Sequence, residues 1–336
     1  MTPYGYHLFK RVGVGFTIVG ESVYTAFMVQ IRFNKLAQQY FFISTLTAWH
    51  FSCNQEHRAL WLKRLPPLSK NDKDQLKKIA KIFKKYGFNS VYPSYYLGSA
   101  FYDYPQNRVW KQVQVMTSQE DYLIIQEIFQ HFQASFDTLW DESVGKLSKI
   151  AEKMIALSES PQCKKIEHLL QCLFGVESIQ FDIVLLLVPE GAQSIGGSAN
   201  TNQHVITVEI NHLRRVTDAL LIAYHEYAHH LWKSLRIRLS LPQNMRGQIK
   251  KIPMFNTQGI SSAWEEYIIR TLLPDGYLAT KMITRPKPAD AIEKRVITQA
   301  RPLIIQYLQE QKPIDKTYAY FVLDYIVDSK DKGGSY

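Results

Sequence analysis

The segment from Ile179 to Val188 is almost continuously apolar, reading Ile-Gln-Phe-Asp-Ile-Val-Leu-Leu-Leu-Val. An apolar run of this length that ends at a turn residue, here Pro189, is typical of a strand buried inside a sheet. A loop of small and polar residues from Gly191 to Gln203 follows, and then His204 to Ile210 alternates in polarity, as a second strand does. The sequence therefore predicts a small sheet in the middle of the chain.

Helical periodicity is found on both sides of this sheet. Apolar side chains recur every three or four positions over long stretches, as on one face of an amphipathic helix. Glycine or proline stands where several of these stretches end, for example Gly87, Gly175 and Pro274. The expected helices are Ser69–Tyr86, Ser118–Leu139, Glu142–Leu157, Cys163–Phe174, Val216–Leu235, Ser261–Leu273, Ala289–Glu310 and Lys316–Val327.

Two segments lack the helical period. Residues 1–52 are aromatic and β-branched, and short runs such as Phe16 to Val19 and Phe41 to Leu46 favour strands. The segment from Asn89 to Val115 is rich in tyrosine, proline and glycine, which favours loops and short strands. Neither segment carries a motif with recognisable chemistry.

The helix expected from Val216 to Leu235 contains His225-Glu226-Tyr227-Ala228-His229, an H-E-x-x-H pattern. Residues four apart lie on the same face of a helix, so His225 and His229 can grip one ion. Three protein ligands and an open position form a catalytic zinc site, in which zinc lowers the pKa of a bound water. Glu226 is placed beside that water, where it can serve as general base.

A third ligand is expected downstream. The metzincin pattern needs a glycine and a histidine at positions that hold Trp232 and Leu235, so this subclass is excluded. Glu265 and Glu266, on the helix expected next, remain as candidates. With this arrangement the chain resembles the gluzincin group of zinc metallopeptidases, the thermolysin-like and aminopeptidase-like enzymes. The resemblance covers about residues 179–273.

The choice between the two glutamates stays open, with Glu266 preferred. Glu266 followed by Tyr-Ile-Ile-Arg is similar to some uncharacterised bacterial members of the group, and its alternative role, an i, i+4 pair with Arg270, is a weak surface interaction. Glu265 shares its side of the helix with the apolar Ile268, Ile269 and Leu272. The family often has an aspartate four residues after its glutamate to orient a histidine. Here that position is Arg270 or Ile269, which leaves the orienting group unknown.

The resemblance implies a zinc-dependent metallopeptidase with one Zn²⁺ and a peptide or protein substrate. It also implies that the strand from His204 to Ile210 is an edge strand that pairs with extended substrate. Gly197 and Asn200 are the expected substrate-binding residues, with an ordinary hairpin loop as the alternative. His230, rotated about 100° from His229, is expected to be structural. The candidates for stabilising an oxyanion are Tyr318, Tyr320 and Tyr325.

The fold expected is α+β and zincin-like, with a small mixed sheet packed on the H-E-x-x-H helix and a mostly helical C-terminal part. The chain has 336 residues, which suits two domain units at roughly 150 residues each. We expect a mixed α/β support region over residues 1–175, a catalytic domain over 176–328 and a flexible tail over 329–336.

Three other interpretations compete with the peptidase. The histidines and glutamate of the motif can be ordinary residues of a helix core, although burying them requires polar partners. A binding or regulatory protein could retain the metal site without turnover. A net charge of +10 invites a nucleic-acid or anionic-surface binder. Part of that charge comes from lysines on one face of a single expected helix, namely Lys73, Lys77, Lys78, Lys81, Lys84 and Lys85. A row of lysines on the polar face of a helix is usually solvated surface, so no nucleic-acid partner is expected.

The cysteines and the N-terminal segment bear on the cellular compartment of the protein. The three cysteines form no C-x-x-C pair, so neither a disulfide framework nor a thiolate metal cluster is expected. Lys10 and Arg11 precede an apolar run from Val12 to Val19 that is similar to the start of a signal peptide, but Glu21 interrupts it. These features favour the cytoplasm and leave export open, and no stretch reaches the roughly 18 apolar residues of a membrane span.

Overall fold

The computed structural model describes residues 29–50, 53–87, 97–193, 196–199, 205–211, 215–237, 239–250, 252, 254–255, 259–283 and 291–331. The strand predicted at Phe16–Val19 lies outside these residues. The chain forms two compact units, Met1–Ile155 with Gln180–Ala219 and Ala156–Ile179 with Leu220–Tyr336. The boundary predicted between residues 175 and 176 falls inside the segment Ala156–Ile179 of the second unit.

The sheet lies in the first unit and has the order β1-β2-β4-β3. Its strands are β1 (Val29–Arg32), β2 (Phe181–Leu187), β3 (Gly197–Ala199) and β4 (Val205–Ile210). β2 is parallel to both β1 and β4, while β3 is antiparallel to β4. An interior strand of a parallel sheet is covered on both faces, which explains the continuous apolar run of β2. The mixed α+β character and the small mixed sheet are therefore confirmed.

The expectation that the second predicted strand is an edge strand is wrong. β4 lies between β2 and β3, and the backbone of Val208 is paired on both sides, with Leu185 and with Gly197. β3 takes the edge instead, in the segment predicted to be a loop. Small residues such as Gly197 and Ser198 carry little strand signal, so β3 was not visible in the sequence.

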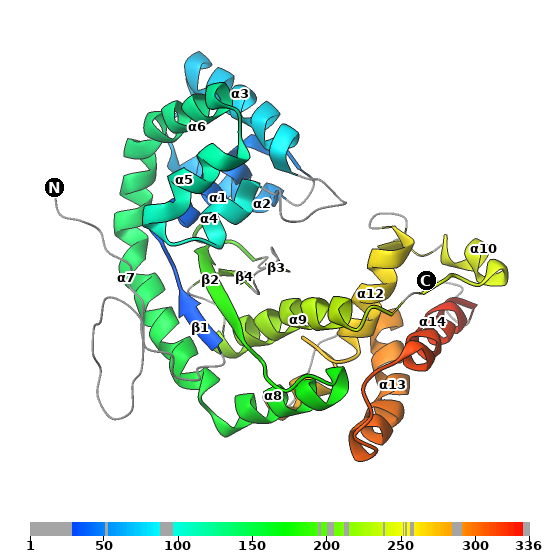
Figure 1. Ribbon diagram of the computed structural model, residues 1–336. Coiled ribbons are helices and arrows are strands. Elements are labelled where there is room, and N and C mark those ends of the chain that lie inside the picture. The colour runs from blue at the N-terminus through cyan, green and yellow to red at the C-terminus, as the bar shows by residue number, and fades with distance from the viewer. Residues whose placement is uncertain are drawn as a thin grey trace. The chain divides into compact units, whose positions relative to one another are not determined.

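Outside the sheet, the described residues of the first unit form helices and the loops between them (Figure 1). Its helices are α1 (Lys35–Thr47), α2 (Gln55–Arg64), α3 (Lys70–Gly87), α4 (Leu97–Tyr102), α5 (Gln106–Met116), α6 (Gln119–His131) and most of α7 (Gln133–Ser158). On α3 the apolar side chains Leu76, Ile79 and Phe83 are buried, and the six lysines of the polar face are exposed. The amphipathic helix predicted there is confirmed, as is its solvated face.

Two predictions in this unit are wrong. Phe41 to Leu46 is not a strand but part of α1, whose start is capped by the Asn34 side chain accepting from the amide of Ala37. Every residue from Ala37 to Ile43 is buried, so α1 is packed around its whole circumference, and this tertiary packing overrides the preference of its aromatic residues for strands. Likewise the segment expected to hold loops and short strands contains α4 and α5. The ring of Phe101 on α4 stacks on that of Tyr40, with 4.5 Å between the ring centroids, so this aromatic residue is part of the core.

The described residues of the second unit form helices and the loops between them (Figure 1). They are α8 (Pro161–Phe174), α9 (Val216–Ser234, which enters the unit at Leu220), η2 (Gln243–Met245), α10 (Arg246–Ile249), α12 (Ile260–Arg270), η3 (Leu278–Lys281), α13 (Ala291–Gln309) and α14 (Lys316–Asp331). α12 contacts α13 and α14, and α8 contacts α13. The stop predicted for α8 is confirmed, because Gly175 takes the left-handed conformation, φ 63°, as its C-cap. Within the described residues, no helix is long and apolar enough to cross a membrane.

Candidate metal centre

The two histidines of the motif lie on α9, which is held firmly in the second unit. Tyr224, one residue before His225, is fully buried and donates a 2.8 Å hydrogen bond to the carboxylate of Glu167 on α8. His225 and His229 are four residues apart and therefore leave the helix on one face. Their side chains are 8% and 13% exposed, so both rings need polar partners.

The partners come from α12. Trp264 anchors this helix, because it is 1% exposed and its indole N–H donates to the carbonyl oxygen of Ala319 on α14 at 2.9 Å. The next two residues, Glu265 and Glu266, point their carboxylates at the histidines. The sequence expectation that a glutamate from a following helix meets the two histidines therefore agrees with the geometry.

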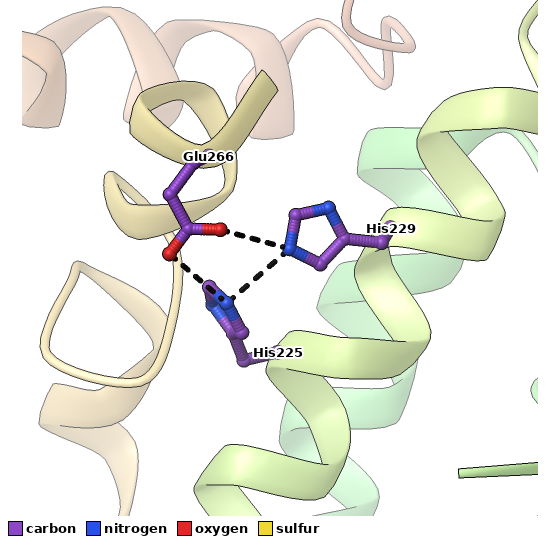
Figure 2. A group of neighbouring side chains, drawn as sticks. All are labelled: His225, His229 and Glu266. Atoms are coloured by element: carbon purple, nitrogen blue, oxygen red, sulfur yellow. Dashed lines mark hydrogen bonds and ion pairs between the residues drawn. The ribbon is translucent and has the colours of Figure 1, made fainter. Parts of the chain in front are cut away.

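Three donor groups converge at one point (Figure 2). Nε2 of His229 lies 3.3 Å from Nε2 of His225 and 3.2 Å from Oε2 of Glu266. Oε1 of Glu266 lies 3.5 Å from Nε2 of His225. Ligands held about 2.0–2.1 Å from a tetrahedral zinc ion are roughly 3.3–3.4 Å apart. The two histidine nitrogens have this spacing, and one carboxylate oxygen of Glu266 lies near each of them. Nitrogen and oxygen donors are of the type that zinc takes.

The outer ring nitrogens are both anchored, which fixes how the rings face the cluster. Nδ1 of His225 lies 2.9 Å from the carbonyl oxygen of Leu273, and Nδ1 of His229 lies 2.7 Å from Oε1 of Glu265. A carbonyl or carboxylate oxygen can only accept, so each Nδ1 carries the proton. In the neutral form that binds a metal, the lone pair of each ring then lies on Nε2, directed at the cluster. This is the arrangement in which histidine binds a metal.

The carbonyl that holds His225 is presented by a tight loop after α12. The amide of Tyr277 donates to Thr271 and that of Leu278 donates to Leu272, both at 2.9 Å, so the chain folds back on the helix end. Gly276 permits this close approach, because a Cβ there would lie 2.3 Å from the carbonyl of Thr271. Gly276 therefore shapes the loop that presents the Leu273 carbonyl to His225.

The electrostatics of the cluster favour a cation. Burial alone would lower the pKa of His229, but hydrogen bonds to Glu265 and Glu266 and the charge of Glu226 raise its pKa to about 10. Burial acts to raise the pKa of Glu266, yet the bonds and charges of His225 and His229 outweigh it and hold that pKa well below its ordinary value. Carboxylates that hold a proton on a buried imidazole this strongly will also attract a metal ion.

Glu266 has one further partner. Nε of Arg270 lies 2.5 Å from Oε1 of Glu266, and Nη1 of Arg270 lies 3.0 Å from Oε2 of Glu293 on α13. The pair of Arg270 and Glu266 is present, but it coexists with the approach of Glu266 to both histidines.

The remaining predicted site residues are distributed as follows. Glu226 is half-buried on α9, and its charge acts on His229. Gly197 lies in β3 of the first unit, while Asn200 lies outside the described residues. His230 does not belong to the described cluster, and its ring lies 6.3 Å from that of Tyr227.

The tyrosines proposed for oxyanion stabilisation make other contacts. Tyr318 is 1% exposed, and its hydroxyl lies 2.6 Å from that of Thr271. The hydroxyl of Tyr320 donates to the carbonyl of Ser240 at 2.7 Å. The ring of Tyr325 lies 4.8 Å from that of Phe321. These contacts give the three side chains a packing role in the second unit.

Sequence reasoning missed three parts of the centre. The Leu273 carbonyl is a backbone group that leaves no signal in the sequence. Glu265 was considered only as a rival ligand, although a second carboxylate beside a ligand is a recognisable sign of a group that orients a histidine. Glu293 lies 23 residues after Arg270 on another helix, and nothing local in the sequence connects the two.

Comparison of the chain with models of protein families, with curated proteins and with solved structures finds no match in any of the three. The donor atoms and their surroundings are therefore the basis on which a function can be proposed.

Proposed function

We propose that this protein is a zinc-dependent metallopeptidase that hydrolyses peptide bonds in a peptide or protein substrate. The observation that supports this most directly is the convergence of His225, His229 and Glu266 at zinc-ligand spacing, with both outer ring nitrogens anchored. Two histidines and a glutamate from a following helix are the ligand set of the gluzincin group, which the sequence resembles over residues 179–273.

In this proposal His225, His229 and Glu266 hold one Zn²⁺. When bound by three protein ligands with an open position, zinc supplies a Lewis acid that brings the pKa of a water near neutrality. Glu265 and the Leu273 carbonyl keep the two rings in the tautomer that ligation requires. These two groups do not bind the metal; they reduce the cost of arranging its ligands.

Glu226 is the proposed general base. It follows His225 directly, so it projects about 100° around the helix from that ligand and remains near the cluster. It is half-buried, and its charge is close enough to act on His229. Its carboxylate can take a proton from an attacking water and deliver it to the leaving amine.

The test is a digest of a peptide library by the wild type, Glu226→Gln and His229→Ala. Glu226→Gln keeps the ligands and the shape of the side chain, so it should bind zinc normally and lose cleavage by about 10² to 10⁴-fold. His229→Ala should lose both zinc and cleavage. Cleavage that persists in both variants would refute the proposal and reveal a contaminating protease, whereas bound zinc without cleavage in the wild type would favour a binding or regulatory protein.

A further inference from the structure

Arg270 connects the candidate metal centre to a buried carboxylate on a third helix. Its Nε lies 2.5 Å from Oε1 of Glu266, and its Nη1 lies 3.0 Å from Oε2 of Glu293. The guanidinium is planar and rigid, so two bonds from different nitrogens fix its orientation as well as its position. A chain of contacts therefore runs from α13 through Arg270 to Glu266 and on to the two histidines.

The burial of Glu293 shows that this chain is more than a surface contact. Its side chain is 2% exposed, against 27% for Arg270 and 15% for Glu266. A buried carboxylate is costly unless it is paired and hydrogen-bonded. Its place in the first turn of α13, where the helix dipole favours negative charge, offsets part of that cost. An apolar side chain at this position would avoid that cost, so the charge of Glu293 fits a role in holding Arg270.

We propose that Arg270, held in place by Glu293, is the positioning residue for the third metal ligand. This inference rests on the proposed function, because it takes Glu266 as a ligand. Arg270 contacts Oε1 of Glu266, the oxygen that also lies 3.5 Å from Nε2 of His225, while Oε2 is directed at Nε2 of His229. The carboxylate is thereby kept from rotating away from the site, and α13 becomes part of the outer support of the metal.

The outer support is consequently divided among three groups, namely the Leu273 carbonyl at His225, Glu265 at His229 and Arg270 at Glu266. In the gluzincin group, which the sequence resembles, an aspartate four residues after the glutamate ligand often orients a histidine. Here Glu265 orients His229 from the position before the ligand, and the residue four positions after it orients the ligand itself.

The charge of Arg270 and its positioning role predict opposite changes in zinc affinity when Arg270 is replaced, so the proposal can be tested. A fixed positive charge repels a zinc ion, so removing it should strengthen zinc binding if electrostatics dominates. If positioning dominates, removing it should weaken binding, because Glu266 loses the contact that aims it. Arg270→Lys keeps the charge but lacks the rigid fork that reaches Glu266 and Glu293 together.

The experiment measures the zinc dissociation constant of the full chain by chelator competition for wild type, Arg270→Gln, Arg270→Lys, Glu293→Gln and the double variant Arg270→Gln/Glu293→Gln. Loss of an outer partner of a metal ligand typically weakens metal binding about 10- to 100-fold. We expect a loss in this range for Arg270→Gln and Arg270→Lys, and a smaller loss for Glu293→Gln. In the double variant, Glu293→Gln should cause little further loss of zinc affinity beyond that of Arg270→Gln, because Glu293 acts through Arg270.

Tyr224→Phe is the matched control. It removes a buried hydrogen bond between α9 and α8 in the same unit without touching the carboxylates of the centre. It should lower thermal stability and leave zinc affinity within about twofold. The visible spectrum of the Co²⁺-loaded protein provides a second measure of coordination, and we expect it to change in the Arg270 variants and not in Tyr224→Phe.

The outcomes separate this inference from the proposed function. If the Arg270 variants unfold more easily yet bind zinc as the wild type does, or bind it more tightly, the ion pairs merely join helices and the inference is overturned. If the wild type binds no zinc, the proposed function falls, and the inference with it. Wild-type zinc binding that is lost in His229→Ala and weakened in the Arg270 variants supports both.

Discussion

Nδ1 of His229 lies 2.7 Å from Oε1 of Glu265, while Nε2 of the same ring lies 3.2 Å from Oε2 of the next residue, Glu266. Two adjacent carboxylates on α12 therefore contact opposite sides of one imidazole. Because a histidine that binds metal through Nε2 donates its other N–H to an acceptor, the two glutamates have different roles. In the proposed metal centre Glu266 is a ligand, and Glu265 orients the ring of His229.

These roles predict different effects for the same substitution. Glu265→Gln should weaken zinc binding about 10- to 100-fold and leave one zinc per chain, because the histidine loses a charged acceptor but all ligands remain. Glu266→Gln should cause the larger loss, because it replaces a ligand. Zinc titration with a competing chelator measures both. The opposite order of the two losses would show that Glu265 is the ligand.

A second prediction concerns the loop that presents the Leu273 carbonyl to His225. Any side chain at position 276 must displace the backbone of Thr271, so Gly276→Ala should lower the free energy of unfolding by about 1–3 kcal/mol and weaken zinc binding as well. Chemical unfolding and zinc titration check the two effects. Gly247→Ala is the matched control, since a Cβ there has no atom within 4 Å. An equal response of the two variants would contradict the role given to the loop.

The third prediction concerns the start of α14, away from the candidate metal centre. Asp315 accepts from the amide of Tyr318 at 3.1 Å and from the hydroxyl of Tyr307 at 2.7 Å, and pairs with Lys312. Burial acts to raise the pKa of Asp315, but the bonds to Lys312 and Tyr307 outweigh it and lower that pKa to about 2, from an ordinary value of 3.8. Asp315, which caps the start of α14, is therefore charged throughout the neutral pH range.

A carboxyl whose pKa is depressed by folding stabilises the protein above its unfolded pKa, and the stabilisation is lost as the pH falls through the folded pKa. Asp315→Ala should cost about 0.5–2 kcal/mol of unfolding free energy at pH 7, as the loss of a helix cap does. The difference from wild type should shrink between pH 4 and pH 2. Denaturant unfolding of both proteins across this pH range measures the difference in unfolding free energy. A difference that grows as the pH falls would contradict the lowered pKa of Asp315.

Part of this structure follows from local sequence pattern. β2 and the helices α3, α8 and α9 have periodicities and end signals that agree with their surroundings, so local and tertiary preferences favour the same structure. α1 shows where this fails. Phe41, Phe42 and Ile43 prefer strands locally, but all three are buried in a helix packed on every side. Which preference wins depends on partners from distant parts of the chain, and no local pattern contains them.

The candidate site divides in the same way. The spacing of His225 and His229 places both on one helix face from the sequence alone, because helix geometry fixes it. Adjacent glutamates differ by about 100° around a helix, so the choice between Glu265 and Glu266 depends on how α12 is rotated toward α9. That rotation is set by contacts such as the bond of Trp264 to Ala319, which only the folded chain reveals.

The most direct test of the central claim is the zinc stoichiometry of the purified protein, measured by calorimetric titration for wild type, His229→Ala and His230→Ala. His230 is the neighbouring histidine on the same helix and lies outside the cluster. We expect one zinc per chain for the wild type and for His230→Ala, and no stoichiometric binding for His229→Ala. Binding that is equally strong in His229→Ala, or absent in the wild type, would contradict the metal centre described for His225, His229 and Glu266.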